Sequence, residues 1–318
     1  MHKLLTDAPG TKMLLLGNEA IARGALEAGL SFATCYPGTP SSEIPQNFFQ
    51  ISQESDLYFE YSTNEKVALE VAAAAAVSGL RTMVTMKHVG LNVAADPLMT
   101  LAYIGVKAGM VIVNADDPYL FSSQNEQDNR FYARLSGLPM LEPTNTQEMK
   151  DMTAAAFALS EDFGLPVILR TTTRLAHVRG PVELGELAPV RTSATFEKNP
   201  FHFVCVPAVS RKLHRELLEK EDRTMARSET GGFNRIIGDG KWGIVANGVS
   251  FNYVMDAVSD LGVRDRVSVL KLGLSWPLPV DLCTRFMNSV EKVLVVEELE
   301  PVNETALKAM AQENGLTL

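Results

Sequence analysis

The sequence predicts an α/β protein with a doubly wound, mostly parallel sheet, followed by a smaller second α/β domain. Short apolar runs alternate with segments of helical composition along most of the chain. This order is expected when helices cover both faces of a parallel sheet. The chain has 318 residues, 46% of them hydrophobic and 21% charged. It is therefore long enough and apolar enough for two domains with separate cores.

The strands of the first domain are predicted from short apolar runs that end in Gly, Pro, Asn or Asp. The first run is closed by Gly17, the second leads into Pro37, and the fifth ends in the polar segment 114–118. The predicted strands are 13–16, 31–36, 58–61, 81–86, 110–113, 138–141 and 166–170.

The helices between these strands are predicted from composition and from capping residues. Ser41 or Ser42 can cap the second helix, and Glu43 lies in its first turn, where a carboxylate is favourable. The third is rich in Ala and Leu, with no Pro or Gly before Gly79. The predicted helices are 19–28, 42–53, 64–79, 91–107, 122–136 and 144–161.

The pattern loosens after the last of these strands. Prolines recur in the following segment, and the charged run 211–227 is typical of a solvated helix. A second α/β domain begins at Trp242, with strands 243–246, 267–272 and 293–297 and helices 248–261, 280–289 and 304–312. We therefore predict three parts: a first domain over 1–185, a connector over 186–240 and a second domain over 241–318.

Charge and composition exclude several functions. A net charge of -9 argues against nucleic-acid binding. We expect no membrane partner, because no apolar run is long enough to span a bilayer. The N-terminus lacks a signal-peptide pattern, so we expect a cytoplasmic protein. Cys35, Cys205 and Cys283 are too far apart in sequence for a zinc ribbon or an iron–sulfur cluster held by this chain alone, and no metal ligands are predicted.

Glu70 is the one carboxyl residue in an otherwise apolar run from 67 to 77. A helix that is apolar all round is expected to be buried. A buried carboxylate must shift its pKa or find a cation, and Lys66 is one candidate partner. Two interpretations stay open: a satisfied core residue, or a carboxyl group kept nearly protonated to hydrogen-bond a ligand.

Two further segments lie at predicted strand ends, where ligands bind in parallel sheets. The segment 36–42 reads Tyr-Pro-Gly-Thr-Pro-Ser-Ser; it could be only a rigid turn with a serine cap, or its Thr39 hydroxyl could bond a ligand. The segment 87–90 contains His88 and Gly90. The segment 238–240 reads Gly-Asp-Gly, but a strand follows at once, so we interpret it as a surface turn.

The turn at 36–42 closely resembles the Tyr-Pro-x-Thr-Pro-Ser-Ser turn of 2-oxoacid:ferredoxin oxidoreductases. The spacing of Glu70 and Gly79 is similar to that of the cofactor-binding Glu and a Gly in thiamine-diphosphate enzymes. The resemblance covers 11–180, like the pyrimidine-binding domain of the family, and 241–313, like its transketolase-C-terminal-like domain.

The resemblance implies a role for each site residue. Glu70 would hydrogen-bond the aminopyrimidine ring of thiamine diphosphate, His88 and Gly90 would lie near the cofactor, and Thr39 would contact the 2-oxoacid. The implied reaction is oxidative decarboxylation to an acyl-CoA with reduction of ferredoxin. The segment 113–117 lacks the Arg of the pyruvate-specific branch, which favours an aryl substrate such as indolepyruvate.

The resemblance also implies parts that this chain does not supply. The complete enzyme would use thiamine diphosphate with Mg²⁺, [4Fe-4S] clusters and coenzyme A. Its partners would be the diphosphate-binding and ferredoxin-like domains, a beta subunit and ferredoxin. The resemblance also implies that the complete enzyme is an oligomer. The chain alone should be inactive. Alternative interpretations are a non-catalytic assembly module or a thiamine-diphosphate enzyme of the transketolase or acetolactate synthase type.

Overall fold

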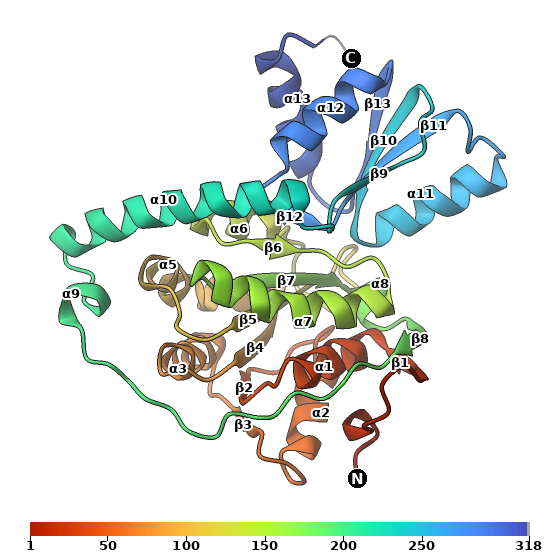
Figure 1. The fold of residues 1–318 in the computed structure, drawn as a ribbon. Coiled ribbons are helices and arrows are strands. Elements are labelled where there is room, and N and C mark those ends of the chain that lie inside the picture. The colour runs from red at the N-terminus through yellow and green to blue at the C-terminus, as the bar shows by residue number, and fades with distance from the viewer. Residues whose placement is uncertain (317–318) are drawn as a thin grey trace.

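A seven-stranded sheet forms the centre of the computed structural model, which describes residues 1–316. Its strand order is β12-β6-β7-β5-β4-β2-β3, and only the edge pair β12 and β6 is antiparallel (Figure 1). The predicted α/β class with a mostly parallel sheet is confirmed. The strands are β2 (Phe32–Cys35), β3 (Tyr58–Tyr61), β4 (Thr82–Lys87), β5 (Met110–Asp116), β6 (Met140–Leu141), β7 (Val167–Thr172) and β12 (Leu274–Trp276).

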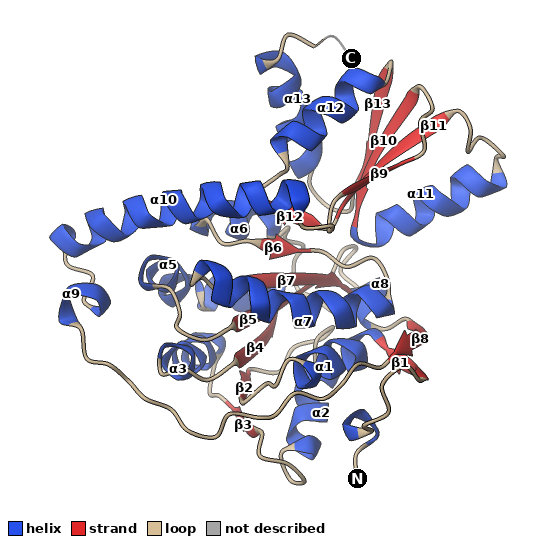
Figure 2. Cartoon of the chain, viewed as in Figure 1, coloured by secondary structure: helices blue, strands red, loops and turns tan. Residues whose placement is uncertain are grey.

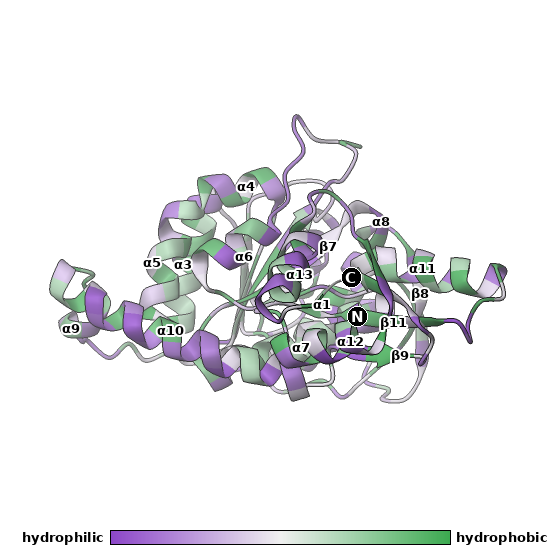
Figure 3. Ribbon diagram, turned by 90° about the horizontal axis from the view of Figure 1, so that it is seen from above, coloured by the Kyte–Doolittle hydropathy of each residue, from purple (hydrophilic) through white to green (hydrophobic). Residues whose placement is uncertain are grey.

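Helices cover both faces of this sheet (Figures 2 and 3). The connections that follow β3, β4 and β5 all lead toward the β12 edge of the sheet. Because such crossovers are right-handed, their helices lie on the same face. These are α3 (Glu65–Val77), α4 (His88–Val93), α5 (Ala95–Ile104) and α6 (Arg130–Ser136). The opposite face carries α1 (Gly17–Glu27), α2 (Glu43–Ile51) and α7 (Thr146–Phe163). Every residue of β5 is buried, as expected for a central strand covered on both sides.

Two predicted elements of the first domain differ from the structure. The predicted helix 122–136 is helical only over α6, and 117–129 is a loop. The strand β1 (Lys12–Leu16) does not join the large sheet; it pairs antiparallel with β8 (Arg179–Glu183). An apolar pattern indicates that a segment is a strand, but the pattern does not specify which partner the strand will have.

A second, four-stranded sheet has the order β13-β10-β11-β9 and its own apolar clusters. Its strands are β9 (Arg235–Ile237), β10 (Trp242–Asn247), β11 (Val267–Leu272) and β13 (Lys292–Val296). The helices around it are α11 (Gly248–Asp260), α12 (Val280–Ser289) and α13 (Val302–Glu313). β12 branches away from this part of the chain and pairs with β6 of the large sheet. The segment 238–240 is a loop between β9 and β10 with Asp239 exposed, as predicted.

The segment between the two sheets carries a long helix, α10 (Pro207–Thr230), which packs along α5, α7 and α12. Short helices η1 (Lys3–Leu5), α8 (Thr173–Ala176) and α9 (Pro200–Phe203) complete the described structure. The predicted solvated helix 211–227 therefore lies within α10, most of whose side chains are not buried. Within residues 1–316, no helix is long and apolar enough to cross a lipid bilayer.

Candidate active site

Three segments meet at the carboxyl ends of β2, β4 and β5. They are the turn 36–42, the segment 87–90 and the loop 117–129. A Cβ at Gly38, in the turn after β2, would lie 2.9 Å from Cδ of Lys87 at the end of β4. The Lys87 ammonium in turn lies 3.5 Å from the carbonyl oxygen of Ser122, in the loop after β5. The absence of a side chain at Gly38 allows this close packing of the turn on Lys87.

Thr39 lies in an ordered turn and its side chain is exposed. The turn is held by the Ser41 hydroxyl, which donates to the Gly38 carbonyl over 2.9 Å, and by the Asn18 amide, which donates to the Pro40 carbonyl over 2.7 Å. Ser42 occupies the N-cap of α2, but its side chain makes no capping bond. These hydrogen bonds agree with the interpretation of the segment 36–42 as a rigid turn. The Thr39 hydroxyl itself has no hydrogen bond to another described residue.

His88 is fully buried and is the first residue of α4. Its Nε2 lies 3.0 Å from the carbonyl oxygen of Asn125, while its backbone carbonyl accepts a bond of 2.9 Å from the Asn129 amide. Its Nδ1 is buried and has no hydrogen-bond partner among the described residues. Such an orphaned atom is normally satisfied by water or a bound molecule.

Glu70 is exposed, so the prediction of a buried carboxyl at this position is wrong. The helix α3 is buried on one face, through Glu65, Ala68, Leu69, Ala72 and Ala76. Position 70 is about 140° around the helix from position 65 and therefore faces solvent. Lys66 does not pair with Glu70 either; its ammonium lies 2.8 Å from the Asp96 carboxylate.

The buried carboxyl of this helix is Glu65, which the sequence analysis did not single out. Its side chain is 8% exposed and makes no hydrogen bond or ion pair with another described residue. A Cβ at Gly90 would lie 2.5 Å from its Oε1, so Gly90 makes room for the carboxyl group. Asn64 caps α3 by accepting the Val67 amide over 3.0 Å, which places Glu65 in the first turn, directly after β3.

Three features of the sequence point to Glu65. Asn64 is a favoured N-cap residue, and a carboxylate in the first turn is stabilised by the helix dipole. Position 65 also follows the carboxyl end of a strand, where ligands bind in parallel sheets. Position 70 lies about 7.5 Å further along the helix axis. The structure thus brings Glu65, Gly90 and His88 to one edge of the sheet, and it leaves Glu70 outside this group.

A buried ionic network lies behind this edge and joins the two sheets. The Arg170 guanidinium contacts the Asp116 carboxylate at 2.7 Å and the Glu142 carboxylate at 2.5 Å. Arg130 pairs with Asp128 and, at 2.5 Å, with Glu297 after β13. Burial raises the pKa of Asp128, but Arg170 and Arg130 outweigh this and hold that pKa below its usual value. Asp116 and Arg130 are therefore held within this network by their ion pairs.

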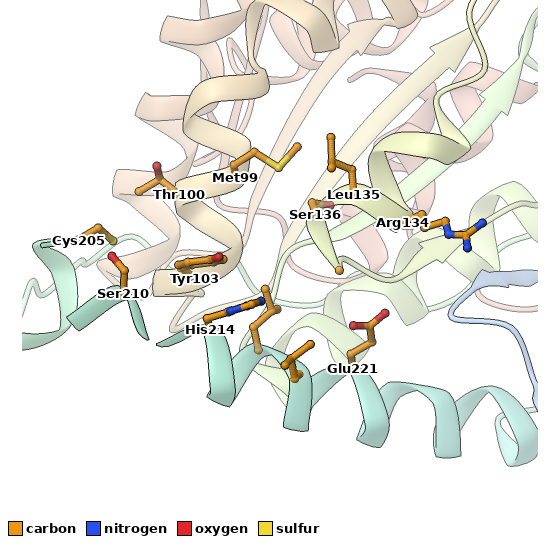
Figure 4. A pocket seen from close by; sticks show the side chains of 13 residues that line it. Met99, Thr100, Tyr103, Arg134, Leu135, Ser136, Cys205, Ser210, His214 and Glu221 are labelled. Carbon is orange, nitrogen blue, oxygen red and sulfur yellow. The ribbon is translucent and has the colours of Figure 1, made fainter. Parts of the chain in front are cut away.

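A separate cavity of about 440 Å³ lies between α5, α6 and α10 (Figure 4). The rings of Tyr103 and His214 stack in it, with centroids 5.4 Å apart. Among the described residues that line this cavity, none belongs to the candidate active site. Residues 1–316 also hold no group of three or more His, Cys, Asp or Glu side chains placed to bind a metal ion.

Comparison with known families identifies the first part of the chain. The family model described as pyruvate flavodoxin/ferredoxin oxidoreductase, thiamine diphosphate-binding, matches residues 23–234, more than half of the chain. The chain belongs to this family. A second model, the indolepyruvate ferredoxin oxidoreductase middle domain, matches residues 234–313. The resemblance to 2-oxoacid:ferredoxin oxidoreductases is thereby confirmed.

Curated relatives in this family include archaeal indolepyruvate oxidoreductase subunits IorA. The protein of Methanothermobacter thermautotrophicus is 50% identical over 100% of this chain and 52% of its own length. That of Pyrococcus horikoshii is 49% identical over 99% of this chain and 50% of its own length. The 2-oxoglutarate synthase subunit KorA of Archaeoglobus fulgidus is 22% identical over 89% of this chain. The chain thus spans about half the length of the IorA relatives.

Two solved structures share the fold of this chain. The 2-oxoglutarate:ferredoxin oxidoreductase from Magnetococcus marinus superposes with a TM-score of 0.77 at 18% identity, over 95% of this chain and 60% of its own. A split-gene transketolase superposes with a TM-score of 0.61 at 15% identity, over 94% of this chain and 85% of its own. At these identities the likeness concerns the fold alone.

Proposed function

We propose that this chain is the pyrimidine-binding half of a thiamine-diphosphate-dependent 2-oxoacid:ferredoxin oxidoreductase that acts on an aryl 2-oxoacid such as indolepyruvate. The observation that carries the proposal is the buried, unpaired carboxyl of Glu65 against Gly90, at the carboxyl edge of the sheet. The names of the IorA relatives support indolepyruvate as the substrate. The complete enzyme would convert the 2-oxoacid to an acyl-CoA and reduce ferredoxin.

The residues at this edge fit a cofactor with a polar heterocycle. When bound, thiamine diphosphate supplies the chemistry that releases carbon dioxide from a 2-oxoacid. Glu65, in place of Glu70, would hydrogen-bond the aminopyrimidine ring and hold a proton at its ring nitrogen. A buried carboxyl group without a hydrogen-bond partner among the described residues is available to bond a ligand. The Nδ1 of His88, which has no partner among the described residues, offers a second polar atom at the same edge of the sheet.

The other proposed contacts follow from the position of the turn after β2. Thr39 presents an unbonded hydroxyl at the same edge, and that hydroxyl can donate to a carboxylate or a carbonyl oxygen of the 2-oxoacid. Gly90 contributes space rather than a side chain, since any larger residue would meet Glu65. His88 and Gly90 are therefore proposed to line the cofactor site, and Thr39 the substrate site.

The rest of the enzyme would come from outside this chain. The IorA relatives are about twice as long, and we propose that their second halves provide the diphosphate and Mg²⁺ site and the ferredoxin-like domain with its [4Fe-4S] clusters. A beta subunit, coenzyme A and ferredoxin would complete an oligomeric, cytoplasmic enzyme. Within this chain, we propose a pyrimidine-binding domain over 1–185, a connector over 186–240 and a transketolase-C-terminal-like domain from 241 onward.

The test uses the full-length chain assembled with its partner subunit. Glu65→Gln should lower turnover by about 10²–10⁴-fold, the range expected for loss of a general acid–base group. Glu70→Gln is the matched control on the same helix and should stay near the wild-type rate, because Glu70 is exposed. Hydrogen–deuterium exchange at C2 of bound thiamine diphosphate should slow in the first variant only. Wild-type exchange in Glu65→Gln, or a large loss in Glu70→Gln, would refute the assignment.

A further inference from the structure

The loop 117–129 presents apolar side chains to solvent beside the candidate active site. Tyr119 is 80% exposed and Phe121 is 56% exposed, and Leu120 between them is also exposed. Three consecutive exposed apolar residues on one loop are unusual, because burial of such side chains stabilises a protein. A surface of this kind commonly marks a binding site.

The backbone of this loop is firmly held although its tip is exposed. The Asp117 carboxylate accepts hydrogen bonds from the Ser122 amide at 2.8 Å, the Ser123 hydroxyl at 2.7 Å and the Thr173 hydroxyl at 2.6 Å. The Tyr119 amide donates to Glu126 over 2.6 Å. The loop therefore carries its apolar side chains on a fixed support, as a preorganised binding surface requires.

The backbone at the tip of the loop adopts an unfavourable conformation that directs the side chains of Tyr119 and Leu120 to solvent. Tyr119 and Leu120 have φ angles of 68° and 59°, in the left-handed region. This region is unfavourable for residues with a Cβ, and it persists only where the surroundings enforce it. Strained backbone of this kind is concentrated at ligand-binding and catalytic sites. The Asp117 carboxylate, which accepts from Ser122 and Ser123, holds the segment that follows these two residues.

The rings form a short row. The centroids of Tyr119 and Phe121 lie 5.8 Å apart with an interplanar angle of 58°. The Arg174 guanidinium lies 5.8 Å from the centroid of Phe121 and 6.0 Å from that of Tyr253 on α11. Arg174 thus supports the Phe121 ring from behind by a cation–π contact, while Tyr119 stays open to solvent.

Contacts along the loop connect this row to the proposed substrate site. Ser122 follows Phe121 directly, and its carbonyl oxygen lies 3.5 Å from the Lys87 ammonium. The Lys87 side chain lies against Gly38, the neighbour of Thr39. A 2-oxoacid whose carbonyl group lies at Thr39 therefore has the aromatic loop close to it, through Lys87 and Ser122.

We propose that Tyr119 and Phe121 receive the aryl group of the substrate and so determine the preference for aryl over small 2-oxoacids. This inference rests on the proposed function and names the specificity residues of the same site. An indole ring stacks favourably on aromatic side chains, whereas the methyl group of pyruvate gains little from them. Loss of one ring should therefore affect large and small substrates differently.

The experiment compares two substrates in the full-length enzyme with its partner subunit. Phe121→Leu should lower kcat/KM for indolepyruvate by about 10-fold to 100-fold, the discrimination typical of an apolar pocket contact, and leave kcat/KM for pyruvate unchanged. Phe121→Tyr retains the ring and should restore the preference. Phe201→Leu is the matched control: Phe201 is 84% exposed on α9, remote from this edge (Figure 1), and this variant should match the wild type.

Each alternative result has a defined meaning. Equal losses on both substrates would show that the loop supports the whole site or contacts another part of the enzyme, and this would overturn the inference. Unchanged kinetics in Phe121→Leu and in the corresponding Tyr119→Leu variant would overturn it as well. A wild-type enzyme that turns over pyruvate but no aryl 2-oxoacid would refute the specificity assignment and leave thiamine chemistry intact. A wild-type enzyme inactive on every 2-oxoacid would refute the proposed function itself.

Discussion

The carboxyl group of Glu65 lies directly against Gly90, so that a Cβ at position 90 would approach Oε1 to 2.5 Å and Cγ to 2.7 Å. The two residues belong to different helices: α3 follows β3 and α4 follows β4, and β2 lies between these two strands in the sheet. Real Cβ atoms do not approach other atoms this closely, so any side chain at position 90 must displace the carboxyl group. Gly90 therefore controls where Glu65 points.

Gly90→Ala should impair catalysis without unfolding the protein. Alanine is favoured over glycine in a helix by about 1 kcal/mol, which offsets part of the cost of moving the flexible Glu65 side chain. We expect a lower affinity for thiamine diphosphate and slower turnover in the full-length enzyme, with a melting temperature close to wild type. Val93→Ala, on the exposed side of the same helix, is the control. Wild-type cofactor affinity in Gly90→Ala would contradict this role.

Arg130 should contribute strongly to stability, because it neutralises buried carboxylates from both parts of the chain. It pairs with Asp128 and Glu297 and donates to the Glu298 and Glu300 carbonyls. Arg130→Met removes the ion-pair partner of Glu297 and leaves Asp128 with only the more distant Arg170, so it should lower the free energy of unfolding by about 3–5 kcal/mol.

Arg134→Met is the matched control for this change, on the same helix. Arg134 is exposed and makes a cation–π contact with Trp276 at 5.7 Å, so its loss should cost about 1 kcal/mol or less. Chemical denaturation of both variants provides the measurement. Similar losses of unfolding free energy in the two variants would show that the buried ion pairs of Arg130 stabilise the fold no more than an exposed arginine does.

Alkylation should distinguish the three cysteines. Cys205 is exposed, whereas Cys35 and Cys283 are buried, and burial raises the pKa of each buried thiol to about 12. Thiolates are the reactive form, so at mildly alkaline pH iodoacetamide should modify Cys205 alone in the native protein and all three after denaturation. Peptide mass spectrometry gives the extent at each site. Modification of native Cys35 at a rate similar to Cys205 would disprove the buried placement of β2.

Asp117 should stabilise the loop 117–129 in a pH-dependent way. Burial raises the pKa of Asp117, but hydrogen bonds from Thr173, Ser123 and Ser122 outweigh it and hold the pKa below the usual 3.8. The folded protein therefore favours the charged form. Its contribution is complete above the unfolded-state pKa and is lost as the pH falls through the lower folded-state pKa.

Asp117→Asn should accordingly lower stability by about 1.5–3 kcal/mol near neutral pH, the range for hydrogen bonds to a charged group. The difference from wild type should shrink as the pH falls below 3.8. Thermal unfolding across a pH series measures it, with Asp239→Asn as the control, since Asp239 is exposed in the β9–β10 loop. A difference that stays constant to acidic pH would rule out the carboxylate as its source.

Local sequence patterns determined most of the elements of this protein. Strands were predicted at 58–61 and 267–272, and the structure has Tyr58–Tyr61 and Val267–Leu272 at those positions. Apolar runs with punctuating Gly, Pro and Asn depend on neighbours along the chain, so they can be read directly. The turn at 36–42 and the segment 87–90 were likewise placed at strand ends, and they are found there. The fold class and the edge that carries the site follow from this information.

Tertiary packing alone decided which side chains face one another. An alanine-rich helix has no apolar stripe that indicates its buried face, so the sequence could not show that α3 turns Glu65 inward and Glu70 outward. The polar run 122–136 has helical composition, but Asp116 and Asp117 bind backbone amides of Asn129 and Ser122 and hold 117–129 as a loop. The partners of β1 and β12 are distant in sequence. Such contacts depend on the whole folded chain, because their energies arise only when remote segments meet.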